Sequence, residues 1–168
     1  MIANCGGLFA QEHSFIDGEV SFFAEASVED IAAKSFQITS TFNSSTGEIA
    51  FEIPIESFVF NKSLMKQHFN EKYMESEKYP NASFKGVVKG FNSKSESSQN
   101  VTASGKLTIH GVTRDSKFEG TITKSQDRLS LESTFVAIFQ DFDIKIPKLF
   151  WRSVAEEVEV KVKVNYRQ

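Results

Sequence analysis

The sequence is poor in cysteine and in long apolar runs, and each shortage excludes a class of protein. Cys5 is the single cysteine, so no disulfide can form within the chain. No stretch approaches 18 consecutive apolar residues, which excludes a transmembrane helix. Basic residues are not in excess either: 19 Lys and Arg stand against 22 Asp and Glu, a net charge of −3. This balance argues against a nucleic-acid-binding surface.

The patterns of catalytic and metal-binding residues are also missing. The three histidines, His13, His68 and His110, show none of the zinc spacings HxH, HExxH or Cys with His. The hydrolase motif GxSxG, the phosphate-binding loop and the dinucleotide motif GxGxxG do not occur. We therefore predict a protein that is not an enzyme and has no metal site. We expect His110 to lie in a turn and to bond a backbone carbonyl.

Phenylalanine is abundant, with 17 residues against 3 Tyr and 1 Trp. Phe adds apolar bulk without a polar atom that needs a partner. A chain of 168 residues fits one domain, and it can bury roughly 70% of the surface that it exposes when unfolded. So much Phe fits either a packed core or an apolar cavity.

Alternating apolar and polar residues predict an antiparallel all-β protein. Seven segments show this period of two: residues 36–42, 49–55, 82–88, 101–109, 116–122, 129–137 and 158–164. One apolar face and one wet face are typical of antiparallel strands. The spacing of the turns indicates about eight strands, which fits a sandwich or an up-and-down barrel.

One helical segment interrupts the strands. Its apolar residues recur at helical spacing from Leu64 to Tyr73. Asn61 or Ser63 can cap its start, and it ends before Pro80. A helix inserted between the strands of a barrel can cover one open end, with its apolar face toward the interior. The alternative is that it packs on the outside of the sheet.

Three glycines, Gly86, Gly105 and Gly120, fall on the inward faces of the predicted strands. A missing side chain at such a position either leaves space in the interior or relieves the curvature of the strand. Both interpretations remain open at this point.

Three motifs carry a resemblance. They read Met-x-x-His-Phe-x-x-x-Tyr over residues 65–73, Tyr-Pro-x-x-x-Phe over residues 79–84, and Gly-x-Leu-x-Ile-x-Gly-Val-Thr over residues 105–113. In order, spacing and residue type they resemble the YceI-like polyisoprenoid-binding family of bacteria, and the likeness runs from about residue 20 to residue 164. It implies an antiparallel, eight-stranded, lipocalin-like β-barrel with one short helix capping an end. It also implies a polyisoprenoid in the lumen.

One position departs from the family pattern. Asp143 stands where we would expect glycine. If this position requires a positive φ, Asp tolerates it better than most residues but less well than Gly.

The binding site that the resemblance implies is a surface of inward apolar side chains. Each buried CH₂ gains roughly 0.8 kcal/mol, so a long tail can bind tightly without directional contacts. For the wall we predict Phe36, Ile38, Phe51, Ile53, Phe84, Leu107, Ile109, Phe118, Leu131 and Phe135. We predict that Leu64, Met65, His68 and Phe69 close one end. Each of these is also an ordinary core residue, and a filled barrel would use the same residues.

Two functions are consistent with these observations. The first is a non-catalytic carrier or store for an isoprenoid quinone or polyprenyl chain, with that lipid as ligand and no cofactor. The second is a ligand-free stress-response or protein-interaction domain with a packed lumen. Among partners we expect the lipid and no nucleic acid; transient membrane contact and a homodimer stay open.

The first residues bear on the location of the protein. Residues 8–11, Leu-Phe-Ala-Gln, look like the end of a secretory signal peptide, although no basic region precedes them. We assign residues 1–12 to a signal-peptide remnant or disordered lead-in, and residues 13–168 to one domain. We expect a periplasmic or secreted protein, with a cytoplasmic one as the alternative.

Overall fold

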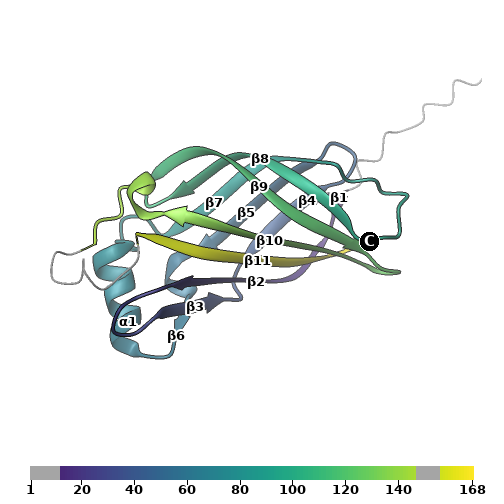
Figure 1. The fold of residues 1–168 in the computed structure, drawn as a ribbon. Helices are drawn as coiled ribbons and strands as arrows, with labels where there is room; N and C mark the ends of the chain where they lie inside the picture. The colour runs from purple at the N-terminus through teal and green to yellow at the C-terminus, as the bar shows by residue number, and fades with distance from the viewer. Residues whose placement is uncertain (1–11, 147–155) are drawn as a thin grey trace, which may run out of the picture.

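The computed structural model describes residues 12–146 and 156–168. Within these residues, eleven strands form a single antiparallel sheet that curls around an interior (Figure 1). The strands are β1 (Glu12–His13), β2 (Phe15–Ala24), β3 (Ile31–Ser35), β4 (Thr39–Asn43), β5 (Glu48–Pro54), β6 (Val59–Phe60), β7 (Asn81–Lys89), β8 (Gln99–Ile109), β9 (Val112–Lys124), β10 (Arg128–Ile138) and β11 (Glu157–Arg167). They lie in the order β1-β4-β5-β7-β8-β9-β10-β11-β2-β3-β6.

The predicted class, an antiparallel all-β fold with one short helix, is confirmed, but the count of eight strands is too low. Each of the seven alternating segments contains a strand, namely β4, β5 and β7 to β11, although residues 36–38 lie outside β4. The other four strands have weak periodicity. β1 and β6 have only two residues each, and β2 carries two consecutive phenylalanines, Phe22 and Phe23, that face opposite sides of the sheet.

At one end of the molecule, a single stretch of chain pairs with β4 and with β11, which lie far apart in the order of the sheet. β1 pairs with β4, and the same stretch of chain continues through Ser14 into β2, which pairs with β11. The Arg167 backbone N–H donates to the Ser14 carbonyl at 2.7 Å. Rings of Phe15, Phe42, Phe91 and Tyr166 pack together here, with centroids 5.8 to 6.4 Å apart. We call these four residues the packed end.

The opposite end carries the helix (Figure 1). There α1 (Ser63–His68) continues into a π-helical turn, η2 (Phe69–Tyr73). Two short 3₁₀ segments, η1 (Ile55–Ser57) and η3 (Phe139–Phe142), complete the elements. Lys62 is the N-cap of α1 and no side chain bonds the free backbone N–H groups, so the predicted capping by Asn61 or Ser63 is wrong.

Two of the three predicted inward glycines allow neighbouring strands to approach closely and do not add space to the interior. Gly86 and Gly105 face each other across β7 and β8, and a Cβ on Gly105 would collide with the Lys85 carbonyl oxygen and the Gly86 Cα. Of the three predicted inward glycines, only Gly120 borders the interior cavity described below.

Candidate ligand-binding cavity

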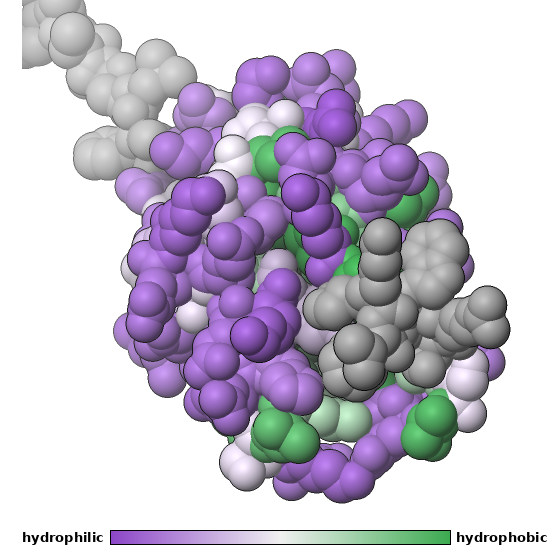
Figure 2. Space-filling model, turned by 90° about the vertical axis from the view of Figure 1, so that its left-hand side faces the viewer, coloured by the Kyte–Doolittle hydropathy of each residue, from purple (hydrophilic) through white to green (hydrophobic). Residues whose placement is uncertain are grey.

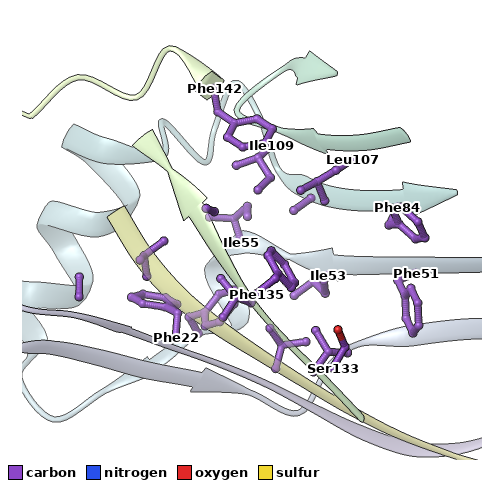
Figure 3. A pocket seen from close by; sticks show the side chains of 18 of the residues that line it. Phe22, Phe51, Ile53, Ile55, Phe84, Leu107, Ile109, Ser133, Phe135 and Phe142 are labelled. Carbon is purple, nitrogen blue, oxygen red and sulfur yellow. The ribbon is translucent and has the colours of Figure 1, made fainter. Parts of the chain in front are cut away.

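The curled sheet encloses a cavity of about 620 Å³. Side chains from β2, β5, β7, β8, β9, β10 and β11 form its wall, and α1 with η2 covers part of the end away from the packed end. Figure 3 shows Phe22, Phe51, Phe84 and Phe135 around this space. In Figure 2, which looks onto the α1 end, hydrophilic residues surround hydrophobic ones that are visible deeper inside. The wall is therefore apolar, and the surface around the opening is mostly hydrophilic.

Twelve of the fourteen predicted site residues line this cavity. They are Ile38, Phe51, Ile53, Met65, His68, Phe69, Phe84, Leu107, Ile109, Phe118, Leu131 and Phe135. They come from separate parts of the sequence, and the curl of the sheet brings them to one surface. Whether they bind a ligand remains a prediction.

Phe36 and Leu64 lie outside the cavity, and each residue is 60% exposed. β3 ends with the buried Ser35, and the chain bends before β4 begins at Thr39, so the alternation of β4 does not extend back to Phe36. The Phe36 ring instead lies 5.5 Å from the Lys34 Nζ. Leu64 is in the first turn of α1, and the next residue, Met65, is the one that faces inward.

An aromatic cluster fastens the helix to the wall. The Phe69 ring stacks on Phe22 of β2 with the centroids 5.3 Å apart. Phe58 and Phe60 surround the same pair, at 5.7 and 5.1 Å from Phe69. The helix thus contributes to the cavity surface, and the alternative in which it only packs outside the sheet is wrong.

The π-helical turn controls which residues of this segment face inward. The Met74 backbone N–H donates to the Phe69 carbonyl, five residues back, at 2.8 Å. The extra residue in the turn changes the helical phase. As a result Tyr73 and Met74 line the cavity together with His68 and Phe69.

Several lining residues were not among the predicted ones. Phe22 and Val20 belong to β2, which lacks a strict alternation, and Phe142 belongs to η3. Val160 and Val162 also line the cavity. The alternating valines of residues 158–164 carry the signal that could have identified these two.

Polar groups are few in the cavity. Ser133 Oγ donates to the Glu119 carbonyl at 2.6 Å, so its hydroxyl is already bonded. Glu29 lies at the rim, where its carboxylate contacts Lys62 Nζ at 2.7 Å and both side chains are well exposed. The Tyr73 hydroxyl has no hydrogen-bond partner among residues 12–146 and 156–168. Burial raises the pKa of the Tyr73 phenol above its ordinary value.

His110 joins three segments at the α1 end. It is 8% exposed and lies in the two-residue turn between β8 and β9. Its Nδ1 donates to the Phe142 carbonyl at 3.0 Å, because a carbonyl oxygen can only accept, and this confirms the predicted contact. Its Nε2 lies 2.8 Å from a Glu75 carboxylate oxygen, and its ring packs on Tyr79 at 4.6 Å. It thus ties the chain after η2 to η3.

Residues 12–146 and 156–168 hold no group of three or more His, Cys, Asp or Glu side chains that could bind a metal ion. Nor do they contain a helix that is both long and apolar enough to cross a membrane.

A comparison with protein families gives a match to the YceI-like domain over residues 9–166. The chain belongs to the YceI-like family. This match includes β1 to β10 in full and all but the last residue of β11. No curated protein matches the sequence.

Several solved structures share the fold of this chain. BcnA of Burkholderia cenocepacia is 16% identical with a TM-score of 0.74, over 88% of this chain and 95% of that one. A polyisoprenoid binding domain from Saccharophagus degradans is 11% identical with a TM-score of 0.75, over 89% and 93%. The YCEI protein of Campylobacter jejuni is 15% identical with a TM-score of 0.58, over 100% and 87%. At these identities the likeness concerns the fold.

Proposed function

We propose that this YceI-like protein binds a long apolar polyisoprenoid in its cavity, without catalysis, and acts as a carrier or store for it. The observation that carries this proposal is the cavity of about 620 Å³ inside the curled sheet, with its apolar wall. A volume of this size lies in the range of small-molecule sites. The description of the Saccharophagus degradans domain as polyisoprenoid-binding supports the same class of ligand.

The apolar wall favours an apolar ligand. A flexible isoprenoid chain would bury its CH₂ groups against this wall, and each buried CH₂ gains roughly 0.8 kcal/mol. The space of about 620 Å³ inside the curled sheet supports this proposal over the alternative of a packed lumen.

An isoprenoid quinone or a polyprenyl chain is the ligand we propose, and the periplasm or the extracellular space is the proposed location. The family and the signal-peptide-like residues 8–11 support export. Residues 1–11 lie outside the described residues.

The first test is to purify the protein without detergent, extract it with organic solvent and identify the lipids by mass spectrometry beside a native mass spectrum. We expect a stoichiometric adduct that resolves into a prenyl lipid. A bare chain mass that persists after incubation with isoprenoid quinones would overturn the proposal.

A cavity-filling variant tests the location of the ligand. Val162 lines the cavity, and its neighbour Lys161 points to solvent. Val162→Trp should therefore displace most of the bound lipid while the sheet stays folded by circular dichroism. Lys161→Trp places the same residue on the outer face of β11 and should bind lipid as the wild type does. Equal lipid content in the two variants would place the ligand elsewhere.

A further inference from the structure

We propose that the α1 end of the molecule docks on the surface of a phospholipid bilayer through exposed apolar side chains, so that the ligand passes between bilayer and cavity without crossing water. The docking follows from the exposed residues themselves, whereas the passage of the ligand rests on the proposed function. The docking surface is centred on Val28, Leu64 and Ile138, and we call these three residues the apolar rim.

The exposed apolar residues gather at one end of the molecule. Among the described residues, eight large apolar residues are exposed. Six of them lie at or near the α1 end, namely Phe23, Val28, Val59, Leu64, Val136 and Ile138. Single exposed apolar residues are ordinary on a protein surface, but their concentration at one place marks an interaction site.

The apolar rim borders an opening of the cavity. Val28 is 87% exposed and Ile138 is exposed too, yet both line the cavity. Residues that contact both the cavity and the solvent lie where the cavity opens. Leu64 lies beside them, because Glu29 of the turn between β2 and β3 contacts Lys62, the N-cap of α1, at 2.7 Å. Figure 2 shows hydrophobic side chains exposed on this face among hydrophilic ones.

A second row of apolar side chains lies behind the rim on the outer face of the sheet. Val136 of β10 and Phe23 of β2 are both exposed, and they pair with Glu159 of β11 from opposite sides. Apolar and charged side chains are therefore neighbours here. This mixture fits the headgroup region of a bilayer, where apolar side chains enter the boundary with the acyl chains and charged ones stay in water.

The arrangement of the rim favours a bilayer over a protein partner. Its three residues come from a turn, a helix and the end of a strand, with the opening of the cavity between them. A stable protein interface usually needs a complementary surface of about 800 Å² on each partner. A fluid bilayer has no fixed shape and needs only side chains that enter it. The proposed ligand also resides in bilayers, because an isoprenoid chain is almost entirely apolar.

Flotation of the detergent-free, full-length protein with phosphatidylcholine vesicles tests the docking. We expect binding that persists in about 0.5 M NaCl, since salt screens charges and not apolar contacts. Leu64→Gln, outside the cavity lining, should weaken this binding about tenfold, the effect of withdrawing one buried aliphatic side chain. Val87→Gln is the matched control, because Val87 is exposed on β7 toward the packed end, and it should bind vesicles as the wild type does.

Two results would overturn the docking. Binding that requires anionic lipid or disappears at high salt would mean that charges and not apolar side chains hold the protein on the membrane. Equal binding of Leu64→Gln and the wild type, with both folded by circular dichroism, would show that the α1 end does not enter the bilayer.

The passage of the ligand is measured by stopped-flow mixing. The protein is loaded with a naphthoquinone that carries a geranylgeranyl chain, and the vesicles contain a pyrene-labelled lipid that the quinone quenches. Docking predicts a transfer rate that rises with vesicle concentration and that Leu64→Gln lowers, whereas Val87→Gln does not. A rate independent of vesicle concentration would mean that the quinone leaves through water, and the direct passage would be wrong. If the protein retains no quinone, the proposed function fails, while flotation still decides the docking.

Discussion

Tyr166 is the largest of the fully buried side chains among the described residues. Its hydroxyl is hydrogen-bonded to the Ser40 hydroxyl at 2.6 Å. Burial raises the pKa of this phenol strongly, although the hydrogen bond with Ser40 acts in the opposite direction. Ser40 also donates to the Ala50 carbonyl at 2.8 Å, so it keeps a partner when Tyr166 is changed.

The raised pKa of Tyr166 predicts a loss of stability in alkali. The unfolded chain releases this proton near pH 10, whereas the folded chain retains it to higher pH. The contribution is therefore complete below about pH 10 and falls as the pH rises further. Tyr166→Phe should cost about 1 kcal/mol at pH 7.5 and show a shallower alkaline decline. Urea unfolding at pH 7.5 and at pH 11 measures both; parallel pH profiles would contradict the prediction.

The comparison with the wild type isolates Tyr166 from the other groups that titrate in the same range. The pKa of Tyr73 is also raised by burial, and that of Lys163 is raised mainly by its hydrogen bond with Glu132. Both groups are present in the wild type and in the variant, so their contributions cancel in the difference.

Backbone conformation at single residues was partly predictable. Asp143 has φ 53°, the left-handed conformation that its place in a glycine position suggested. His110 and Gly111 have φ values of 51° and 72°, as a two-residue hairpin turn requires, and Gly in second place indicates such a turn. Glu75, with φ 44°, has no sequence signal. Its conformation accompanies a contact with His110, which is 35 positions away in the chain.

At the scale of elements, β7 and β8 approach closely where Gly86 faces Gly105. Gly105→Ala would push a methyl group into the Lys85 carbonyl and the Gly86 Cα, which are backbone atoms that cannot rotate away. We expect a destabilisation of about 1–3 kcal/mol, the usual cost of overpacking. Chemical denaturation measures it, with the exposed neighbour Ser104→Ala as the control. If Gly105→Ala lowers the free energy of unfolding no more than Ser104→Ala does, the two strands can move apart without cost.

His110 links elements rather than supporting the whole sheet. His110→Asn tolerates the positive φ but cannot reach both Glu75 and the Phe142 carbonyl. Hydrogen exchange should therefore accelerate in residues 74–79 and 139–144, with the central strands β8 to β11 unchanged. His13→Asn, at the packed end, should leave both of these segments protected. Uniform acceleration over all strands would mean that the contact is part of the global core.

Strands were predictable where apolar and polar residues alternate regularly, as in β7 to β11. They were not predictable where a strand is defined by its pairing with a distant part of the sequence. The pairing of β3 with β6 rests on two residue pairs, Ala33 with Phe60 and Lys34 with Val59. β3 has five residues and β6 has two, and sequences this short do not indicate which strand they pair with. The phase break at Phe36 has the same origin, because the bend before β4 lies between two strands that pair with different partners.

At the scale of the whole molecule, the apolar residues of the site could be predicted but the cavity could not. The same Phe, Ile and Leu side chains would line a hollow curl or fill a narrow one. The outcome depends on how far apart opposite walls lie, which the sheet order and its curvature determine. The residues of the helical segment that face inward could not be fully predicted either. The π-helical turn brings Tyr73 to the cavity, and no sequence pattern indicates that turn.

Ligand binding should be coupled to global stability. A ligand that binds only the folded protein stabilises it by about 2.7 kcal/mol when its free concentration is 100 times its Kd. Delipidation should therefore lower the Tm, and a matching isoprenoid should restore it in a concentration-dependent manner, as differential scanning calorimetry can follow. Val162→Trp, with its cavity filled, should show a Tm that lipid no longer changes. An equal response of both proteins would indicate binding outside the cavity.

The position of β11 in the sheet governs when the molecule can form. It lies between β10 and β2, so Gly18 pairs with Val164, which is 146 positions further along the chain. Until residues 157–167 have been synthesised, β2 lacks the strand that joins it to β10, and Phe22 cannot meet the rest of the wall. A nascent chain therefore exposes its apolar strands until synthesis reaches the last of them. The proposed binding of a lipid in the cavity would then follow the pairing of β11.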